Sequence, residues 1–104
     1  MDTLTRLEKT IAQRRQADPS QSYVASLHAK GLPQIARKLG EEGVEAAVAA
    51  LSGSSEELVG EAADILFHLL VTLNALDIPF AAVLAELDRR DGVSGIAEKA
   101  SRSQ

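Results

Sequence analysis

The chain has 104 residues, enough for one domain and too few for a second core of useful size. Its formal net charge is -4, with 11 Lys and Arg against 15 Asp and Glu, which argues against general binding of nucleic-acid phosphates. Because it contains no cysteine, disulfides and thiolate metal sites are excluded, and any metal ion must be held by oxygen or histidine.

Three helices are predicted in the first half of the chain. Leucine and isoleucine recur at helical spacing over residues 3 to 17, where the polar segment "DPSQS" ends the pattern. A short helix follows between Ser22, whose side chain can cap it, and Gly31, which suits a left-handed position at its end. A third helix begins near Pro33, because proline fits the first turn of a helix, and runs to Leu51.

Two more helices are predicted in the second half of the chain. Ser54 and Glu57 have the spacing of a capping box, so a long helix is expected over about residues 55 to 76. Apolar side chains surround much of its circumference, which is more than one small domain can cover. A fifth helix starts at Pro79, and Gly92 closes it before a polar end that we expect to fray.

These elements predict an all-α fold, a bundle of about five helices with two long central ones, because no strand-like alternation or internal repeat is found. We expect a single domain over residues 1 to 104, with residues 92 to 104 as a flexible tail. The N-terminus lacks the pattern of a signal peptide, and His68 and Thr72 interrupt the longest apolar stretch. A cytoplasmic protein without a membrane anchor is therefore expected.

Four acidic residues lie beside the apolar faces of the two long helices. Glu42 and Glu45 are three residues apart, as are Glu61 and Asp64, so each pair projects from neighbouring turns of one helix face. An antiparallel packing of the helices would bring the pairs together. Carboxylates without a counterion repel and raise one another's pKa values, whereas a divalent cation such as Mg²⁺ takes oxygen ligands and removes the conflict.

The same spacing also fits a solvated acidic face, since glutamate is common on helices, and the residues alone leave both interpretations open. Gly40 and Gly43 flank the glutamates of one pair, and Gly60 precedes Glu61. Each glycine costs about 1 kcal/mol relative to alanine inside a helix. We interpret them as leaving space for a substrate or letting helices approach closely.

The segments "KLGEEGVEAAVAA" and "ELVGEAADILFHLLVTL" resemble the all-α nucleoside-triphosphate pyrophosphohydrolase superfamily. The superfamily motif, EExxE, a spacer and ExxD, reads here as Glu41, Glu42, Glu45, Glu61 and Asp64. With "SYVASLHAKG" before it and "ADILFHLLV" after it, the sequence is similar, more narrowly, to the phosphoribosyl-ATP pyrophosphohydrolase family of histidine biosynthesis. The likeness covers roughly residues 4 to 90.

The resemblance implies hydrolysis of 1-(5-phosphoribosyl)-ATP to 1-(5-phosphoribosyl)-AMP and pyrophosphate, dependence on Mg²⁺, and an intertwined or tightly packed homodimer in the cytoplasm. The apolar fourth helix fits a partner chain independently, because obligate homodimers bury surfaces that resemble a divided core. In many organisms a cyclohydrolase domain with cysteine ligands is fused to this activity. This chain has neither its length nor its cysteines, so only the pyrophosphohydrolase step is expected.

Site roles are expected as follows. The candidate Mg²⁺ ligands are Glu42, Glu45, Glu61 and Asp64. The candidate catalytic residues are these four acids and Glu41, which can serve as an outer-sphere acid, a proton acceptor or only a surface charge. The candidate substrate contacts, three cations for phosphate and one tyrosine for stacking or hydrogen bonding, are Tyr23, Lys30, Arg37 and Lys38.

The sequence leaves two possible roles open for each of Lys38 and His68. Lys38 can contact a substrate phosphate or form a salt bridge with Glu42 one turn later. His68 follows Asp64 by one turn and can orient it, although a buried histidine with satisfied hydrogen bonds is the more ordinary interpretation.

Three other functions compete with the phosphoribosyl-ATP reaction. A house-cleaning pyrophosphohydrolase of the same superfamily would act on dUTP or damaged nucleoside triphosphates. A metal-free helical dimerisation module would explain the apolar fourth helix but not the acid pairs. A di-iron bundle would need Glu-x-x-His pairs, and neither His28 nor His68 lies three residues after a glutamate.

Overall fold

The structure is a computed structural model, and it describes residues 2–93 and 95–102, apart from the side chain of Glu98. All regular elements of these residues are helices, which confirms the all-α class. They are α1 (Thr3–Arg14), α2 (Tyr23–Lys30), α3 (Leu32–Ser52), α4 (Ser55–Ala75), α5 (Phe80–Arg90) and α6 (Gly95–Arg102). The expected bundle of about five helices thus gains a sixth, α6, which forms within the stretch expected to be a tail.

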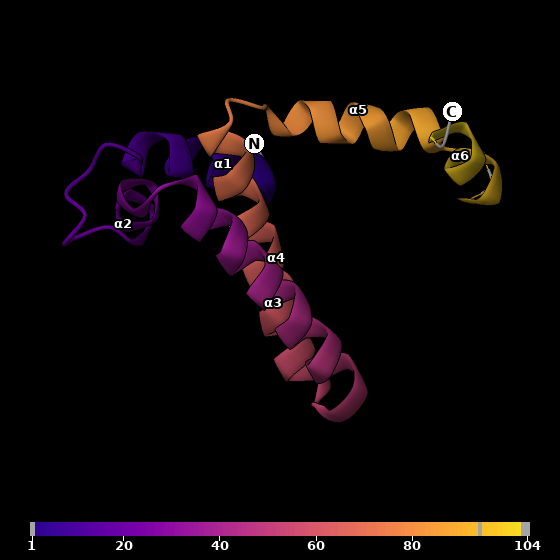
Figure 1. Cartoon of the computed structure of the whole chain (residues 1–104), viewed down its shortest axis with the longest axis horizontal. Coiled ribbons are helices and arrows are strands. Elements are labelled where there is room, and N and C mark those ends of the chain that lie inside the picture. Colours follow the sequence, from indigo (N-terminus) through magenta and orange to yellow (C-terminus); the bar gives the residue numbers. More distant parts are fainter. Residues whose placement is uncertain (1, 94, 103–104) are drawn as a thin grey trace.

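Helices α3 and α4 form a long antiparallel hairpin, as the predicted meeting of the two acid pairs requires (Figure 1). A tight connection joins them: a Cβ added at Gly53 would lie 2.9 Å from the carbonyl oxygen of Ala49, so a side chain has no room there. The predicted cap at Ser54 is confirmed, because its hydroxyl accepts a hydrogen bond from the Glu57 amide at 3.2 Å.

The hydrophobic core lies at one end of this hairpin, where α1 and α2 cover it. Its buried members come from α1, α2, α3 and α4: Ile11, Val24, Leu27, Ile35, Leu70 and Val71. The members on the hairpin are Ile35, near the start of α3, and Leu70 and Val71, near the end of α4. The opposite end of the hairpin therefore has no covering layer from α1 or α2. Ala50, near the end of α3, is exposed for that reason.

The polar segment between α1 and α2 shortens the first helix relative to the predicted range of 3 to 17. Helix α1 ends at Arg14, and the Ala17 amide then donates to the Arg14 carbonyl at 3.1 Å in a turn. The predicted cap at Ser22 is confirmed by its 3.2 Å bond from the Ala25 amide. Gly31, the predicted end of α2, has a φ of 95°, which suits glycine.

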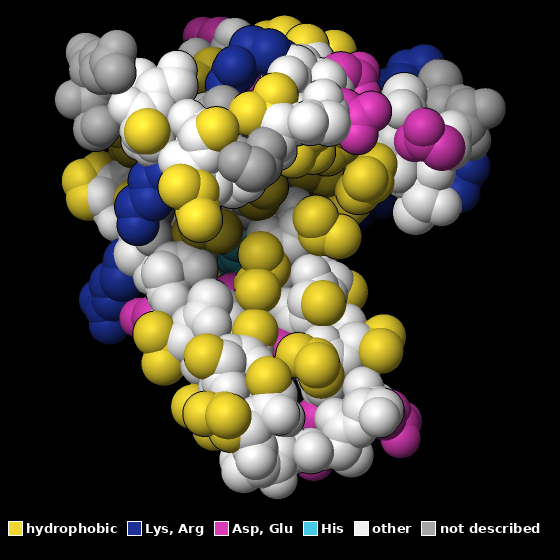
Figure 2. All heavy atoms as spheres, turned by 90° about the vertical axis from the view of Figure 1, so that its right-hand side faces the viewer, with side chains coloured by type: hydrophobic (Ala, Val, Ile, Leu, Met, Phe, Trp, Pro, Cys, Tyr) yellow, Lys and Arg dark blue, Asp and Glu magenta, His cyan; other side chains and the backbone are white. Residues whose placement is uncertain are grey.

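Exposed apolar side chains occur along both helices of the hairpin. They include Val44, Val48, Leu51, Val59 and Leu66, with Leu51 90% exposed and Val59 69% exposed. Figure 2 shows hydrophobic side chains gathered along the face of the hairpin that lies on the same side as α5. By length and composition alone α4 could also cross a membrane, a test that the core helices of soluble proteins pass as well.

Helix α5 extends away from the hairpin like an arm, and none of its residues is buried (Figure 1). Two side chains of the α1 region fix the corner from which it starts. Glu8 Oε2 accepts a hydrogen bond from the Phe80 amide at 2.7 Å, at the positive end of α5. Arg15 Nη1 donates to the carbonyl of Asn74 at 3.0 Å, near the negative end of α4, and lies 3.4 Å from Asp77 Oδ1.

We expect Glu8→Ala to lower the free energy of unfolding by about 1 to 2 kcal/mol, because the first amide of α5 loses its charged acceptor. Urea denaturation monitored by circular dichroism measures this change. Lys9→Ala, a change at the exposed neighbouring position, is the matched control and should have little effect. Equal losses of unfolding free energy for the two variants would contradict a stabilising role for the bond between Glu8 and Phe80.

Candidate active site

Three glutamates from the two long helices meet where α3 and α4 pack. Carboxylate oxygens of Glu42, Glu45 and Glu61 all lie within 4.8 Å of one another. Glu42 is only 7% exposed, Glu61 is half-buried and Glu45 is exposed. The antiparallel hairpin therefore joins the first acid pair to one member of the second, as the sequence predicts.

The environment of these glutamates disfavours the ionised form of all three carboxylates at once. Burial raises the pKa of Glu42, and a hydrogen bond with Glu45 and the charge of that residue raise it further. Burial also raises the pKa of Glu61, followed by the charge of Glu45. In the described residues, the buried Oε2 atoms of Glu42 and Glu61 have no hydrogen-bond partner.

Such a donor set fits a hard divalent cation. Every candidate ligand is a carboxylate oxygen, the type that Mg²⁺ and Ca²⁺ prefer, and two of the oxygens are buried without a donor to satisfy them. A cation would satisfy those oxygens and remove the repulsion together. A purely solvated acidic face would not place Glu42 in a buried position.

Asp64, the fourth candidate ligand, lies outside the group of three but beside it. It lines a pocket of about 540 Å³ together with Glu45 and Glu61. Its charge also helps to raise the pKa of Glu42, although less than burial and Glu45 do. The side chains that complete this pocket include Val44, Val48 and Ala49, an apolar wall that the acid motif itself does not reveal.

The glycines around the acids face open space. A Cβ built at Gly40, Gly43 or Gly60 would meet no atom within 4 Å, so close approach of helices within this chain does not require them. Between α3 and α4, that half of the sequence interpretation does not hold. Gly60 lines the acid pocket, which agrees with the other half, space for a bound molecule.

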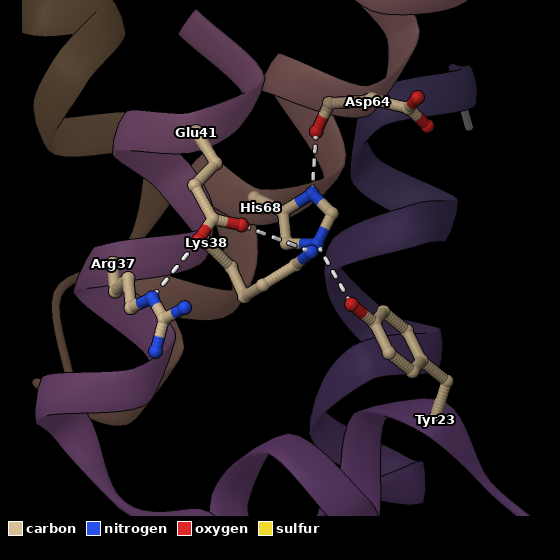
Figure 3. Close-up of polar contacts among 6 residues, drawn as sticks. All are labelled: Tyr23, Arg37, Lys38, Glu41, Asp64 and His68. Atoms are coloured by element: carbon tan, nitrogen blue, oxygen red, sulfur yellow. Dashed lines mark hydrogen bonds and ion pairs between the residues drawn. The ribbon is translucent and has the colours of Figure 1, made fainter.

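The fifth acid of the motif, Glu41, belongs to a separate basic cluster on α3 (Figure 3). Its Oε1 accepts a hydrogen bond from Arg37 Nε at 2.9 Å, and its Oε2 lies 3.4 Å from Lys38 Nζ. These bonds, Arg37 first, lower the pKa of Glu41, while the bond to Glu41 raises that of Lys38. The salt bridge considered between Lys38 and Glu42 is thus replaced by one to Glu41.

The remaining candidates lie on α2 and α4. The Tyr23 hydroxyl lies 3.2 Å from His68 Nε2, and His68 Nδ1 donates to the Asp64 carbonyl at 2.8 Å (Figure 3). His68 is therefore a buried histidine with both ring nitrogens satisfied, as the more ordinary interpretation holds. Lys30 is exposed at the last residue of α2 and does not line the acid pocket.

Comparison with known proteins identifies the family. The phosphoribosyl-ATP pyrophosphohydrolase family matches residues 4 to 91, nearly the whole described chain. The chain belongs to this family. Proteins named phosphoribosyl-ATP pyrophosphatase are similar to it throughout: that of Novosphingobium aromaticivorans is 68% identical over 98% of the chain and 95% of the relative. That of Erythrobacter litoralis is 64% identical over 98% of each, and that of Dinoroseobacter shibae 57% identical over 98% of the chain and all of the relative.

Family membership confirms the resemblance drawn from the motifs, and the structure shows how this family member distributes its motif acids. Glu42, Glu45 and Glu61 form the carboxylate group, and Asp64 lines the adjoining pocket. Glu41 pairs instead with the side chains of Arg37 and Lys38. The motif thus divides into an acidic part and a basic part along α3.

We expect the metal-free protein, kept in EDTA, to reveal the charge conflict as a pH dependence of stability. A pKa of Glu42 raised above 4.5 means that the folded chain holds the proton more tightly, so its free energy of unfolding gains as pH falls toward 4.5. Glu42→Gln removes this gain. The stability advantage of the variant over the natural chain should therefore be largest near pH 7.5 and shrink toward pH 5.

Other groups must be separated from this effect. Burial lowers the pKa of His28 below 6.5, which makes both proteins lose stability as pH falls through this region. The lowered pKa of Glu41 acts only below its ordinary value of 4.5. Because both contributions are common to the two proteins, the difference in unfolding free energy from urea titrations reports the acid group alone: Glu42 itself and the part of the raised Glu61 pKa that the charge of Glu42 causes. A difference that is constant with pH would contradict the buried-charge account.

Proposed function

We propose that the chain hydrolyses 1-(5-phosphoribosyl)-ATP to 1-(5-phosphoribosyl)-AMP and pyrophosphate, the second step of histidine biosynthesis, with Mg²⁺ and in the cytoplasm. The family match and the names of the relatives support the reaction. The observation that carries the metal dependence is the group formed by Glu42, Glu45 and Glu61, with two buried oxygens that lack a partner. The substrate carries a triphosphate, which a metal ion held by these carboxylates would attract.

The proposed metal ligands are Glu42, Glu45 and Glu61, joined by Asp64 from the pocket wall. Bound Mg²⁺ supplies concentrated positive charge that offsets the charge developing on phosphate oxygens and makes water a better nucleophile. The chain contributes the positions of its carboxylates, which α3 and α4 fix relative to one another. Val44, Val48 and Ala49 make one side of the pocket apolar.

Arg37 and Lys38 are the proposed phosphate contacts, because they present two positive charges on α3 one turn before the acid group. Glu41 holds both, and its lowered pKa makes it a poor proton acceptor. We therefore assign Glu41 to orienting these cations and leave proton transfer to the acids of the pocket. The ring of Tyr23, half exposed, and the ammonium of Lys30 are the other proposed substrate contacts.

We expect pyrophosphate release to be fastest with phosphoribosyl-ATP in a panel that includes ATP and dUTP. Glu61→Gln and Asp64→Asn should each lower kcat/KM at least about 100-fold, because each removes a charge from the site. Glu56→Gln is the matched control on the same helix, since Glu56 is exposed and does not line the acid pocket.

Two outcomes would overturn this assignment. Preference for dUTP or another plain nucleotide would indicate a house-cleaning enzyme of the superfamily. Undiminished turnover by Glu61→Gln would remove the acid group from the reaction. A metal-free dimerisation module is distinguished by melting curves, because only a metal site gains stability specifically with Mg²⁺.

A homodimer is the second part of the proposal. Apolar side chains such as Leu51 and Val59 are exposed along both helices of the hairpin, and they are too many to be singly scattered surface residues. The acid pocket includes Val44 and Val48, so the apolar surface and the site adjoin. A second copy of the chain would cover this surface, and α5, which packs little against its own chain, could then reach the partner.

We expect Val59→Asp to raise the dissociation constant of the dimer at least about 100-fold, because it places an unpaired charge against an apolar surface. Sedimentation velocity at several concentrations measures the shift. Gln13→Glu adds the same charge at an exposed position of α1 and is the control. A natural chain that stays monomeric at high concentration would contradict the proposed dimer.

A further inference from the structure

His68 forms hydrogen bonds that fix which ring nitrogen carries its proton. Nδ1 lies 2.8 Å from the carbonyl oxygen of Asp64, and a carbonyl oxygen can only accept, so Nδ1 must donate. In the neutral ring, Nε2 then carries a lone pair. The Tyr23 hydroxyl, 3.2 Å away, is therefore the donor to Nε2.

Ring packing holds these groups in place. The Tyr23 ring stacks on Phe67, with centroids 5.9 Å apart and an interplanar angle of 20°. The His68 ring meets Phe67 edge-on at 5.1 Å and Tyr23 at 5.9 Å. His68 is 5% exposed, whereas Tyr23 is 51% exposed, so the bridge runs from the surface of α2 into the buried side of α4.

This arrangement has consequences for both residues. Neither nitrogen of His68 is available to a metal ion while the two bonds are in place. The Tyr23 hydroxyl donates its only hydrogen bond to His68 Nε2, so it cannot also donate one to a phosphate oxygen. Phosphate recognition is left to the cations Lys30, Arg37 and Lys38, and the Tyr23 hydroxyl has a different task.

We propose that Tyr23 and His68 are a positioning pair for the acid site, in which the Tyr23 hydroxyl holds the His68 ring and the ring holds the carbonyl of Asp64. The chain of bonds ties α2 to the turn of α4 that carries Glu61 and Asp64. The inference rests on the proposed function, since the site it positions is the proposed Mg²⁺ site. Neither residue touches the reacting atoms in this role.

The test is the affinity for Mg²⁺ itself, measured by isothermal titration calorimetry on the full chain without substrate. Tyr23→Phe keeps the ring but removes the hydroxyl, and we expect its Mg²⁺ dissociation constant to rise about 3- to 10-fold. This is less than the roughly 10- to 100-fold typical of a lost outer-sphere partner, because the effect passes through the backbone. Thr72→Val is the matched control: it removes the 2.7 Å bond from Thr72 Oγ1 to the His68 carbonyl and leaves the ring bonds intact.

A second variant keeps the test meaningful if packing is disturbed. His68→Asn retains a donor near the Asp64 carbonyl but cannot reach Tyr23, so the double variant with Tyr23→Phe should bind Mg²⁺ no more weakly than His68→Asn alone. Saturating Mg²⁺ should also restore kcat of Tyr23→Phe toward the natural value. If the hydroxyl instead bound substrate directly, added Mg²⁺ would not restore it.

The outcomes separate this inference from the proposed function. If the natural chain binds Mg²⁺ and Tyr23→Phe binds it equally well, the positioning role alone is overturned. Nitrogen NMR of His68 that places the proton on Nε2, or additive effects of the two substitutions, would also overturn it. If the natural chain does not bind Mg²⁺ at all, the proposed metal site fails and the inference fails with it.

Discussion

Charge repulsion among the carboxylates between α3 and α4 is the constraint on which the site depends. Glu42 is held in a buried position beside Glu45 and Glu61, and folding has to keep these groups together against their preference to separate or to remain protonated. The hairpin achieves this because its helices are fixed elsewhere, by the core under α1 and α2. At the proposed metal site, a cation would bind to positions already prepared for it, and the repulsion that it relieves would become part of its affinity.

The chain separates stability from function along the length of the hairpin. One end carries the fully buried residues, such as Leu27, Ile35 and Val71, and provides the packing that keeps the helices in register. The acid group occupies the middle, and the far end, with Leu51 and Val59, exposes apolar side chains. A small chain with so little core at one end is the kind of protomer that gains stability from a partner, which would also limit the movement of the acid-bearing helices.

Sequence patterns predicted the helices and their caps because these depend on local chemistry. Ser22 and Ser54 cap as expected, and the three-residue spacing of Glu42 and Glu45 put both on one face, which the antiparallel helices bring to Glu61. What local patterns could not provide was the choice among competing tertiary partners. Asp64 lies beside the group and the glycines of α3 face open space, since both depend on how α3 and α4 are rotated against each other. Within α3, Lys38 pairs with Glu41 rather than Glu42, a choice that spacing alone leaves open because both glutamates lie within one turn of the lysine.

The division of α3 into an acidic turn and a basic turn suits a substrate that must be bound without being trapped. Arg37 Nε lies 2.9 Å from Glu41, whereas Lys38 Nζ is 3.4 Å away, so the lysine has the weaker hold on its carboxylate. Exposed ion pairs of this kind contribute little to stability, and an arriving phosphate can replace one of them at small cost. In the proposed exchange Glu41 would stay paired with Arg37 and keep a negative charge beside Lys38, whose pKa it raises in the structure.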